Sequence, residues 1–270
     1  MAKTSPARWR NIVIFTLLVL GIGNIAGLNY FAVQGLGGLL FILSPLLVTL
    51  GMRLFAGDGW GDAGFRPGLR AHPGVYLTAL LLFPVLFALG LGIGAALSVV
   101  QFQPGWGRAL AMAVLTGAPV VLIYAFSEEF SWRGYLEPRL ESLGLPALPR
   151  HLLVAVIWWA WHVGYVLSQP GYTTLPLPLF FLLFFVAMVA MALLYGVWRR
   201  RTGSFWPAVI AHGVANTLAW PLLTPGIVTI DNSLAFAARP EALVVLAGLC
   251  LAALVAWRLP VSRESLRGSP

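Results

Sequence analysis

The sequence predicts an all-α polytopic membrane protein in which about eight transmembrane helices form one bundle. Of its 270 residues, 59% are apolar and only 10% are charged, whereas a soluble domain has about 25% charged residues. The apolar residues form long continuous runs and not the alternating pattern of a membrane barrel. A bilayer-crossing helix needs about 20 mainly apolar residues, and several runs reach that length. Mean hydropathy is +0.86.

Eight apolar runs are the candidate spans. The first follows a basic start, but its apolar core is longer than the roughly 7–15 residues of a signal peptide, so we expect an uncleaved span. The second and third contain Pro45 and Pro84, which membrane helices tolerate. The fourth ends in an acidic motif, and we expect it to continue as a surface helix near 128–143 that carries Arg139 and Glu141 to the interface. The eight runs are 11–33, 36–56, 74–100, 107–126, 151–168, 176–198, 204–223 and 241–259.

The basic residues orient the bundle. With the N-terminus in the cytoplasm, 15 of the 17 Lys and Arg residues fall in cytoplasmic segments, and only Arg108 and Arg239 fall on the other side. This distribution follows the positive-inside rule, so both termini are predicted to be cytoplasmic. The net charge of +8 is then a consequence of topology. Because the basic residues are spread over short segments, no nucleic-acid partner is expected.

The sequence predicts a single membrane domain, 1–270, surrounded by membrane lipid. Its motif-bearing core is expected at about 107–223. The one cysteine, Cys250, excludes a disulfide framework and is expected to be a small buried apolar residue. The abundance of Ala, Gly, Arg and Pro indicates a bacterial cytoplasmic membrane. The sequence leaves the oligomeric state open.

The first polar cluster is Glu128-Glu129-x-x-x-Arg133, at the end of the fourth span. Of the nine acids, only Glu128 and Glu129 adjoin a span where they can face its interior, and acids at that depth are costly and usually functional. Glu129 and Arg133 are spaced i,i+4 for an ion pair. Glu128 lacks that partner, which suits a general acid or base. The alternative is a solvated interfacial Glu–Arg pair.

Histidines supply the other two clusters. His162 lies within the fifth span beside three tryptophans, and its alternative reading is an interhelical hydrogen bond or an interfacial position. His212 and Asn216 share one face of the seventh span, with helix packing as the alternative. His72 and His151 are expected to be solvated or capping residues.

The three clusters point to one site. Counted from the cytoplasmic ends of their spans at 1.5 Å per residue, His162 and His212 both lie roughly 12–18 Å below the inner surface. Glu128 ends a span on the same side. We therefore expect a single cavity that opens toward the cytoplasm.

In this order, the clusters resemble the CAAX-processing and bacteriocin-processing intramembrane proteases, the ABI or CPBP family related to the Ras-converting endopeptidase. The family pattern is E-E-x-x-x-R, then F-x-x-x-H, then H-x-x-x-N, over a bundle of about eight helices. Trp158 stands where Phe is usual. The motifs cover roughly 127–216, so the remaining spans match only in architecture.

The resemblance implies hydrolysis of a peptide bond. Glu128 would activate the attacking water, with Glu129 supporting it while held by Arg133. The side chains that would polarise the carbonyl and hold the oxyanion are His162, His212 and Asn216. A zinc ion held by Glu128, His162 and His212 is the alternative. A direct glutamate mechanism is preferred because asparagine is a poor zinc ligand and a good oxyanion donor.

Two other classes of function compete with the protease. One is a catalytically silent immunity-type or scaffolding protein of the same family. The other is a proton-coupled transporter, which predicts an internal repeat that the sequence lacks. The expected substrate is a peptide or membrane protein, cut near its C-terminus or a membrane-proximal part and possibly lipidated. A bacterial origin would favour bacteriocin precursors or peptide pheromones over prenylated chains.

Overall fold

The computed structural model describes residues 8–31 and 35–259. The first predicted span, 11–33, runs into the gap between these ranges, and both predicted cytoplasmic termini lie largely outside the described residues. The long helices are Trp9–Leu28 (α1), Leu36–Phe55 (α2), Pro73–Ala96 (α3), Trp106–Ser131 (α4), Ala147–Trp161 (α6), Leu177–Thr202 (α8), Trp206–Leu222 (α9) and Leu243–Arg258 (α11).

Every predicted apolar run has a helix at its place. Among the described residues, six helical segments are long and apolar enough to cross a membrane: α1, α2, α3, α8 and two composite segments, Trp106–Ser142 and Ala147–Ser168. Helices α9 and α11 have 17 and 16 residues, which is short for a full crossing. The structure therefore supports a polytopic helical membrane protein with six segments that are long and apolar enough to cross a membrane.

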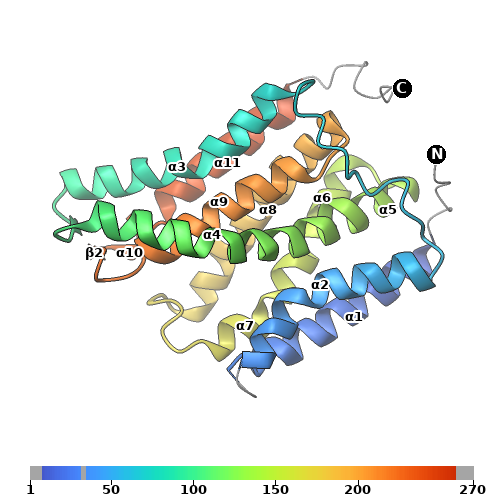
Figure 1. The fold of residues 1–270 in the computed structure, drawn as a ribbon, viewed down its shortest axis with the longest axis horizontal. Coiled ribbons are helices and arrows are strands. Elements are labelled where there is room, and N and C mark those ends of the chain that lie inside the picture. Colours follow the sequence, from blue (N-terminus) through green and yellow to red (C-terminus); the bar gives the residue numbers. More distant parts are fainter. Residues whose placement is uncertain (1–7, 32–34, 260–270) are drawn as a thin grey trace.

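The helices form a layered bundle. Figure 1 shows α3 and α11 along one flank and α1 and α2 along the opposite flank, with α4, α8 and α9 between them. Helix α4 packs against α9 and α2, and α6 packs against α8. This arrangement places the C-terminal ends of α4 and α6 and the middle of α9, which carry the three motifs, inside the bundle.

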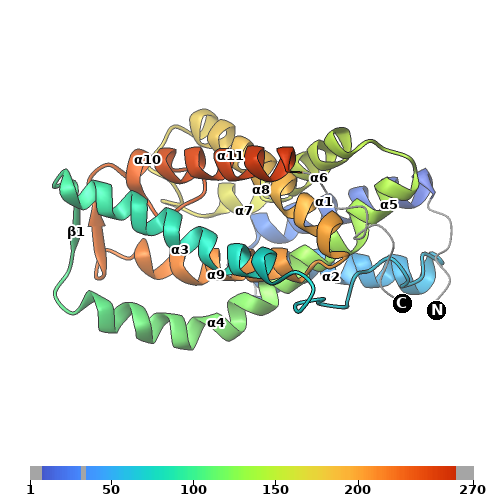
Figure 2. The same cartoon turned by 90° about the horizontal axis from the view of Figure 1, so that it is seen from above.

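A small sheet departs from the all-α expectation. Strands Val100–Phe102 (β1) and Val228–Ile230 (β2) pair antiparallel, with Val100 opposite Ile230. They lie at one end of the molecule, and α5 lies at the opposite end (Figure 2). The pairing ties the connection before α4 to the connection after α9, and the short helix Ser233–Phe236 (α10) follows β2.

Helix α4 continues beyond its acidic motif. It passes through a π-helical turn, Trp132–Leu136 (η2), into Glu137–Ser142 (α5). Such turns leave backbone carbonyls without regular helical partners. Here the carbonyl of Arg133 accepts a 3.0 Å hydrogen bond from Arg199 Nε, and that of Gly134 accepts one from Arg53.

The predicted interfacial position of Arg139 is wrong. Its side chain is 2% exposed and lies 3.1 Å from Asp62 and 3.8 Å from Asp58, in the loop after α2. Burial of these charges is tolerable because each one has an opposite partner. Glu141 does reach the surface, with 56% of its side chain exposed.

The fifth predicted span is broken at His162. Helix α6 ends at Trp161, and the short helix Val163–Ser168 (α7) follows. The carbonyl of Ala160 and the amide of Gly164, which a continuous helix would join, are instead bridged by Asn24 of α1. Asn24 Nδ2 donates to Ala160 O at 3.1 Å, and Gly164 N donates to Asn24 Oδ1 at 2.7 Å.

Gly164 permits this close approach. A Cβ at that position would stand 2.5 Å from the backbone oxygen of Asn24, closer than non-bonded atoms can come. The helix break that positions His162 is therefore held by a side chain from a distant helix, in the way that neighbouring helices satisfy broken membrane helices.

Candidate active site

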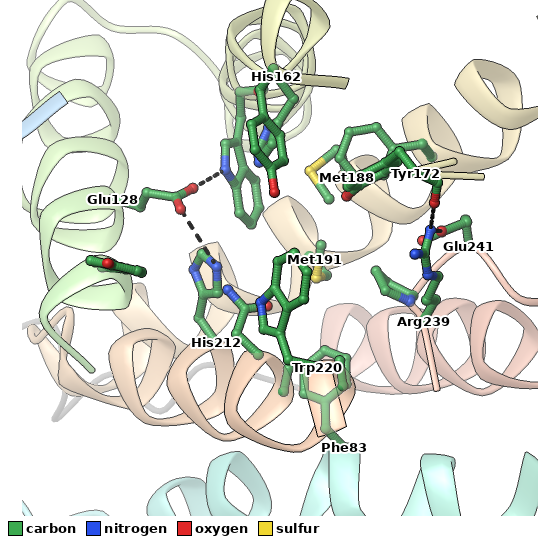
Figure 3. A pocket seen from close by; sticks show the side chains of 18 of the residues that line it. Phe83, Glu128, His162, Tyr172, Met188, Met191, His212, Trp220, Arg239 and Glu241 are labelled. Atoms are coloured by element: carbon green, nitrogen blue, oxygen red, sulfur yellow. Dashed lines mark hydrogen bonds and ion pairs between the residues drawn. The ribbon is translucent and has the colours of Figure 1, made fainter. Parts of the chain in front are cut away.

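Four of the predicted site residues line one cavity of about 270 Å³: Glu128, His162, His212 and Asn216. They come from the last turn of α4, the break between α6 and α7, and one face of α9. Figure 3 shows Glu128 and His212 facing each other at one end of the cavity, with His162 nearby. The structure thus brings these four residues, from three separate motifs, together in one cavity.

Glu129 and Arg133 lie behind the cavity wall. Both side chains are fully buried, and Arg133 Nη1 donates to Glu129 Oε2 at 2.8 Å, as the i,i+4 spacing predicts. The other oxygen of Glu129 lies 2.9 Å from His212 Nδ1. Glu129 thus connects Arg133 to His212, and the solvated interfacial pair is excluded.

Arg133 is enclosed by aromatic rings. Its guanidinium lies 4.6 Å from the ring centre of Trp158 and 5.0 Å from that of Tyr195. Its Nε and Nη2 make no hydrogen bond with any of the described residues. An arginine with no exposed surface is stabilised here by one carboxylate and by cation–π contacts with two rings.

Glu128 has two polar neighbours. Its Oε2 accepts a 2.7 Å hydrogen bond from Trp158 Nε1, and its Oε1 lies 3.8 Å from His212 Nε2. From its position in the motif, Trp158 is expected only to replace one aromatic ring, phenylalanine, by another. Indole carries an N–H group that phenylalanine lacks, and this chemical difference is the signal that could have identified the contact.

Hydrogen bonds fix the two histidine rings. His212 Nδ1 faces a carboxylate oxygen, which can only accept, so this nitrogen carries a proton and Nε2 points toward Glu128. His162 Nδ1 lies 2.9 Å from the carbonyl oxygen of Trp158. A carbonyl oxygen can only accept, so Nδ1 carries the proton and Nε2 is the ring nitrogen not engaged by this bond. The amide of Asn216 makes no hydrogen bond within the described part of the chain and remains available to a ligand.

The far end of the cavity holds a second polar group. Arg239 and Glu241 lie there, separated from Glu128 by apolar side chains such as Met188 and Met191 (Figure 3). Arg239 Nη1 donates to the carbonyl of Tyr172 at 2.5 Å and lies 3.5 Å from Glu241 Oε1. Burial raises the pKa of Glu241, and the charge of Arg239 opposes this shift.

The residues do not form a metal-binding group. Within residues 8–31 and 35–259, no three His, Cys, Asp or Glu side chains are arranged to hold a metal ion. Glu128, His162 and His212, the ligands of the alternative zinc site, line the same cavity but do not form such a group.

Several buried polar residues escaped the sequence analysis. Besides Glu128 and Glu129, the acids Asp58, Glu137 and Glu241 are buried, being 1%, 2% and 6% exposed. The expectation that His151 is solvated is wrong, because it is fully buried.

His151 is buried because a glycine makes room for it. Its ring lies against Gly196 of α8, where a Cβ would stand 2.2 Å from the ring. His151 Nδ1 lies 3.5 Å from Glu137 Oε1, and neither side chain makes a hydrogen bond within residues 8–31 and 35–259.

The fold and the site together define a class: a helical membrane protein with a buried glutamate–histidine site inside its bundle. Residues 110–218 match the family model described as type II CAAX prenyl endopeptidase Rce1-like. Over this segment the chain is similar to the Rce1-like family, and the match supports the family that its motifs predict. The segment contains all six predicted site residues, and the family supports a membrane-embedded protease. No curated protein matches the sequence.

Proposed function

We propose that this protein is an intramembrane endopeptidase in which Glu128 is the general base that activates water. The observation that carries the proposal is the position of Glu128. Its carboxylate is held by Trp158 Nε1 at 2.7 Å and faces His212 Nε2 at 3.8 Å, in a cavity with room for a peptide segment. A carboxylate held this way in a mostly apolar cavity suits proton transfer to and from a reacting group.

In the proposed reaction, a water oxygen bonds to the scissile carbonyl carbon while Glu128 takes one water proton. The carbonyl oxygen becomes an oxyanion. Asn216 donates its side-chain amide N–H to that oxyanion. His212 donates from Nε2 when that nitrogen is protonated. The tetrahedral intermediate then loses the amine, which leaves with the proton that Glu128 held. No step requires a metal ion.

Glu129, Arg133 and His162 have supporting roles in this proposal. Glu129 fixes the ring of His212 through Nδ1, and Arg133 fixes Glu129. His162 Nδ1 is occupied by a backbone carbonyl, so its Nε2 is the atom that faces water or substrate. Preorganised groups of this kind lower the cost of reorganisation during the reaction.

The setting is also part of the proposal. We place 1–270 in a bacterial cytoplasmic membrane as one domain with eight spans, cytoplasmic termini, and an active site reached from the cytoplasmic side at its Glu128 end. In this orientation Arg239, at the other end of the cavity, lies toward the opposite side of the membrane. The 15-to-2 distribution of basic residues supports this orientation. The substrate is a peptide or membrane protein, cut near its C-terminus or a membrane-proximal part, and it need not be lipidated.

The test uses purified protein in nanodiscs and a fluorogenic peptide library. Glu128→Gln should lower kcat by roughly 10²–10⁴-fold, while the circular-dichroism spectrum stays unchanged. Glu141→Gln is the matched control, because Glu141 is exposed on α5 and lies outside the cavity. A chelator added in parallel should leave the rate unchanged.

Full cleavage by Glu128→Gln would refute the proposed base. Loss of cleavage with chelator would replace the direct glutamate mechanism by a metal-dependent one. A wild-type protein that cleaves no peptide, with cellular function retained in Glu128→Gln, would support the immunity-type or scaffolding alternative.

A further inference from the structure

The end of the cavity opposite Glu128 carries a charge that the proposed chemistry does not use. Arg239 is the only Lys or Arg among the described residues that line this cavity. It also lines a second cavity of about 400 Å³, bordered by β2 and the loop 171–175. Both cavities share Tyr172, Arg239 and Glu241, so Arg239 lies where they meet.

The guanidinium of Arg239 is only partly engaged. Nη1 donates to the carbonyl oxygen of Tyr172 at 2.5 Å, and its distance to Glu241 Oε1 is 3.5 Å. A full Arg–carboxylate pair makes two parallel bonds of about 2.7–2.9 Å. Nε and Nη2 of Arg239 make no hydrogen bond with any described residue. The contact with Glu241 is thus long and single, and two donors remain for another acceptor.

The surroundings of Arg239 favour an anion. Its side chain is 24% exposed, and its guanidinium lies 4.8 Å from the ring centre of Tyr172. Aromatic rings and methionine side chains line the path between Arg239 and Glu128. A planar cation held at the end of an apolar cavity binds a carboxylate strongly, because few waters compete and both oxygens can be bonded.

We propose that Arg239 forms a carboxylate-binding subsite, which holds a carboxylate of the peptide substrate while the scissile bond lies at Glu128. This inference rests on the proposed function for the identity of the ligand as a peptide. The C-terminal carboxylate is one source, because every unmodified peptide has one and it must lie on the leaving-group side of the cut. An Asp or Glu side chain is the second source. Glu241 occupies part of the subsite when no substrate is bound.

The experiment measures binding so that it does not depend on turnover. The full-length Glu128→Gln variant in nanodiscs is titrated with a short fluorescent apolar peptide, made as the C-terminal acid and as the C-terminal amide. The acid should bind about 10–100-fold more tightly, the range expected for a charge-assisted bidentate contact. A third peptide, an amide with one added Asp, tests whether a side-chain carboxylate substitutes for the terminal one.

Two further substitutions separate ligand binding from a structural ion pair. Arg239→Met should abolish the preference for the acid. Glu241→Gln should retain or increase that preference, because it removes the competing carboxylate and leaves the guanidinium in place. If the pair were only structural, both substitutions would weaken acid and amide alike. The matched control is Arg108→Met, an exposed arginine on α4 that lines neither cavity.

Each outcome decides a different question. Equal binding of acid and amide, or no measurable binding of either, overturns the subsite. An acid preference that persists in Arg239→Met also overturns it. A preference that is lost in Arg239→Met, in a protein whose wild type cleaves no peptide, supports the subsite and counts against the proposed protease activity.

Discussion

Asn24 is expected to stabilise the helix break that positions His162, and the substitution Asn24→Ala tests this role. Its side chain joins the Ala160 carbonyl to the Gly164 amide, at 3.1 Å and 2.7 Å, across the break between α6 and α7. Asn24→Ala would leave both backbone groups without partners, in a region with little water to replace them.

The expected loss of stability follows from these bonds. Interhelical hydrogen bonds in membrane proteins contribute about 0.6 kcal/mol on average and up to about 1.7 kcal/mol. A buried polar group left without a partner costs about 1–3 kcal/mol. For the two bonds together we expect a loss of about 1–3 kcal/mol, with a lower kcat because His162 loses its fixed position.

The assay is reversible unfolding in mixed micelles, followed by circular dichroism. Asn29→Ala is the matched control, because Asn29 is also near the end of α1 but makes only an exposed bond within its own helix, to Ile25 O at 2.8 Å. That variant should change stability by no more than about 0.5 kcal/mol. Equal stability of the two variants would refute the bridging role of Asn24.

Three other predictions concern packing, the general base and pH. Gly196→Ala should destabilise the protein by about 1–3 kcal/mol, because the new Cβ would stand 2.2 Å from the ring of His151. Trp158→Phe should lower kcat by roughly tenfold with the fold retained, because Glu128 loses its 2.7 Å hydrogen bond. Glu241→Gln should gain stability relative to wild type as pH rises from about 4 to about 7, because the raised pKa of Glu241 makes its ionisation in the folded state unfavourable.

A control variant or a contradicting result tests each of these three predictions. Gly117→Ala is the control for the first, since nothing lies within 4 Å of its added Cβ, and it should be neutral or stabilising by up to about 1 kcal/mol. Trp159→Phe controls the second, because the Trp159 indole bonds Phe181 O and not Glu128. A stability difference between Glu241→Gln and wild type that stays constant across this pH range would contradict the third.

The sequence by itself determined the parts of this protein that depend on neighbours along the chain. Hydropathy is a local sum, so each of the eight apolar runs has a helix at its place, although the fifth run is broken at His162. The Glu129–Arg133 pair is also local, because i,i+4 residues meet on any helix. The motifs on α4, α6 and α9 contain four side chains that line the cavity: Glu128, His162, His212 and Asn216.

Tertiary structure decided which distant groups meet those side chains. Trp158 reaches Glu128 across 30 positions of sequence, and His212 reaches Glu129 across 83. The indole N–H is a local signal that a polar partner exists, but Trp159 and Trp161 carry the same group, so it does not tell which tryptophan meets Glu128. Only the packing of α6 against α8, with α4 close by, selects the one that faces the acid.

Burial of charge was decided in the same way. Arg139 and His151 look interfacial from their local sequence, yet both are buried. Arg139 can be buried because Asp58 and Asp62, from the loop after α2, lie beside it. His151 can be buried because Gly196 leaves space for its ring. A charged or polar side chain enters a membrane protein's interior only where a partner or a gap exists, and both are set by the contacts between helices.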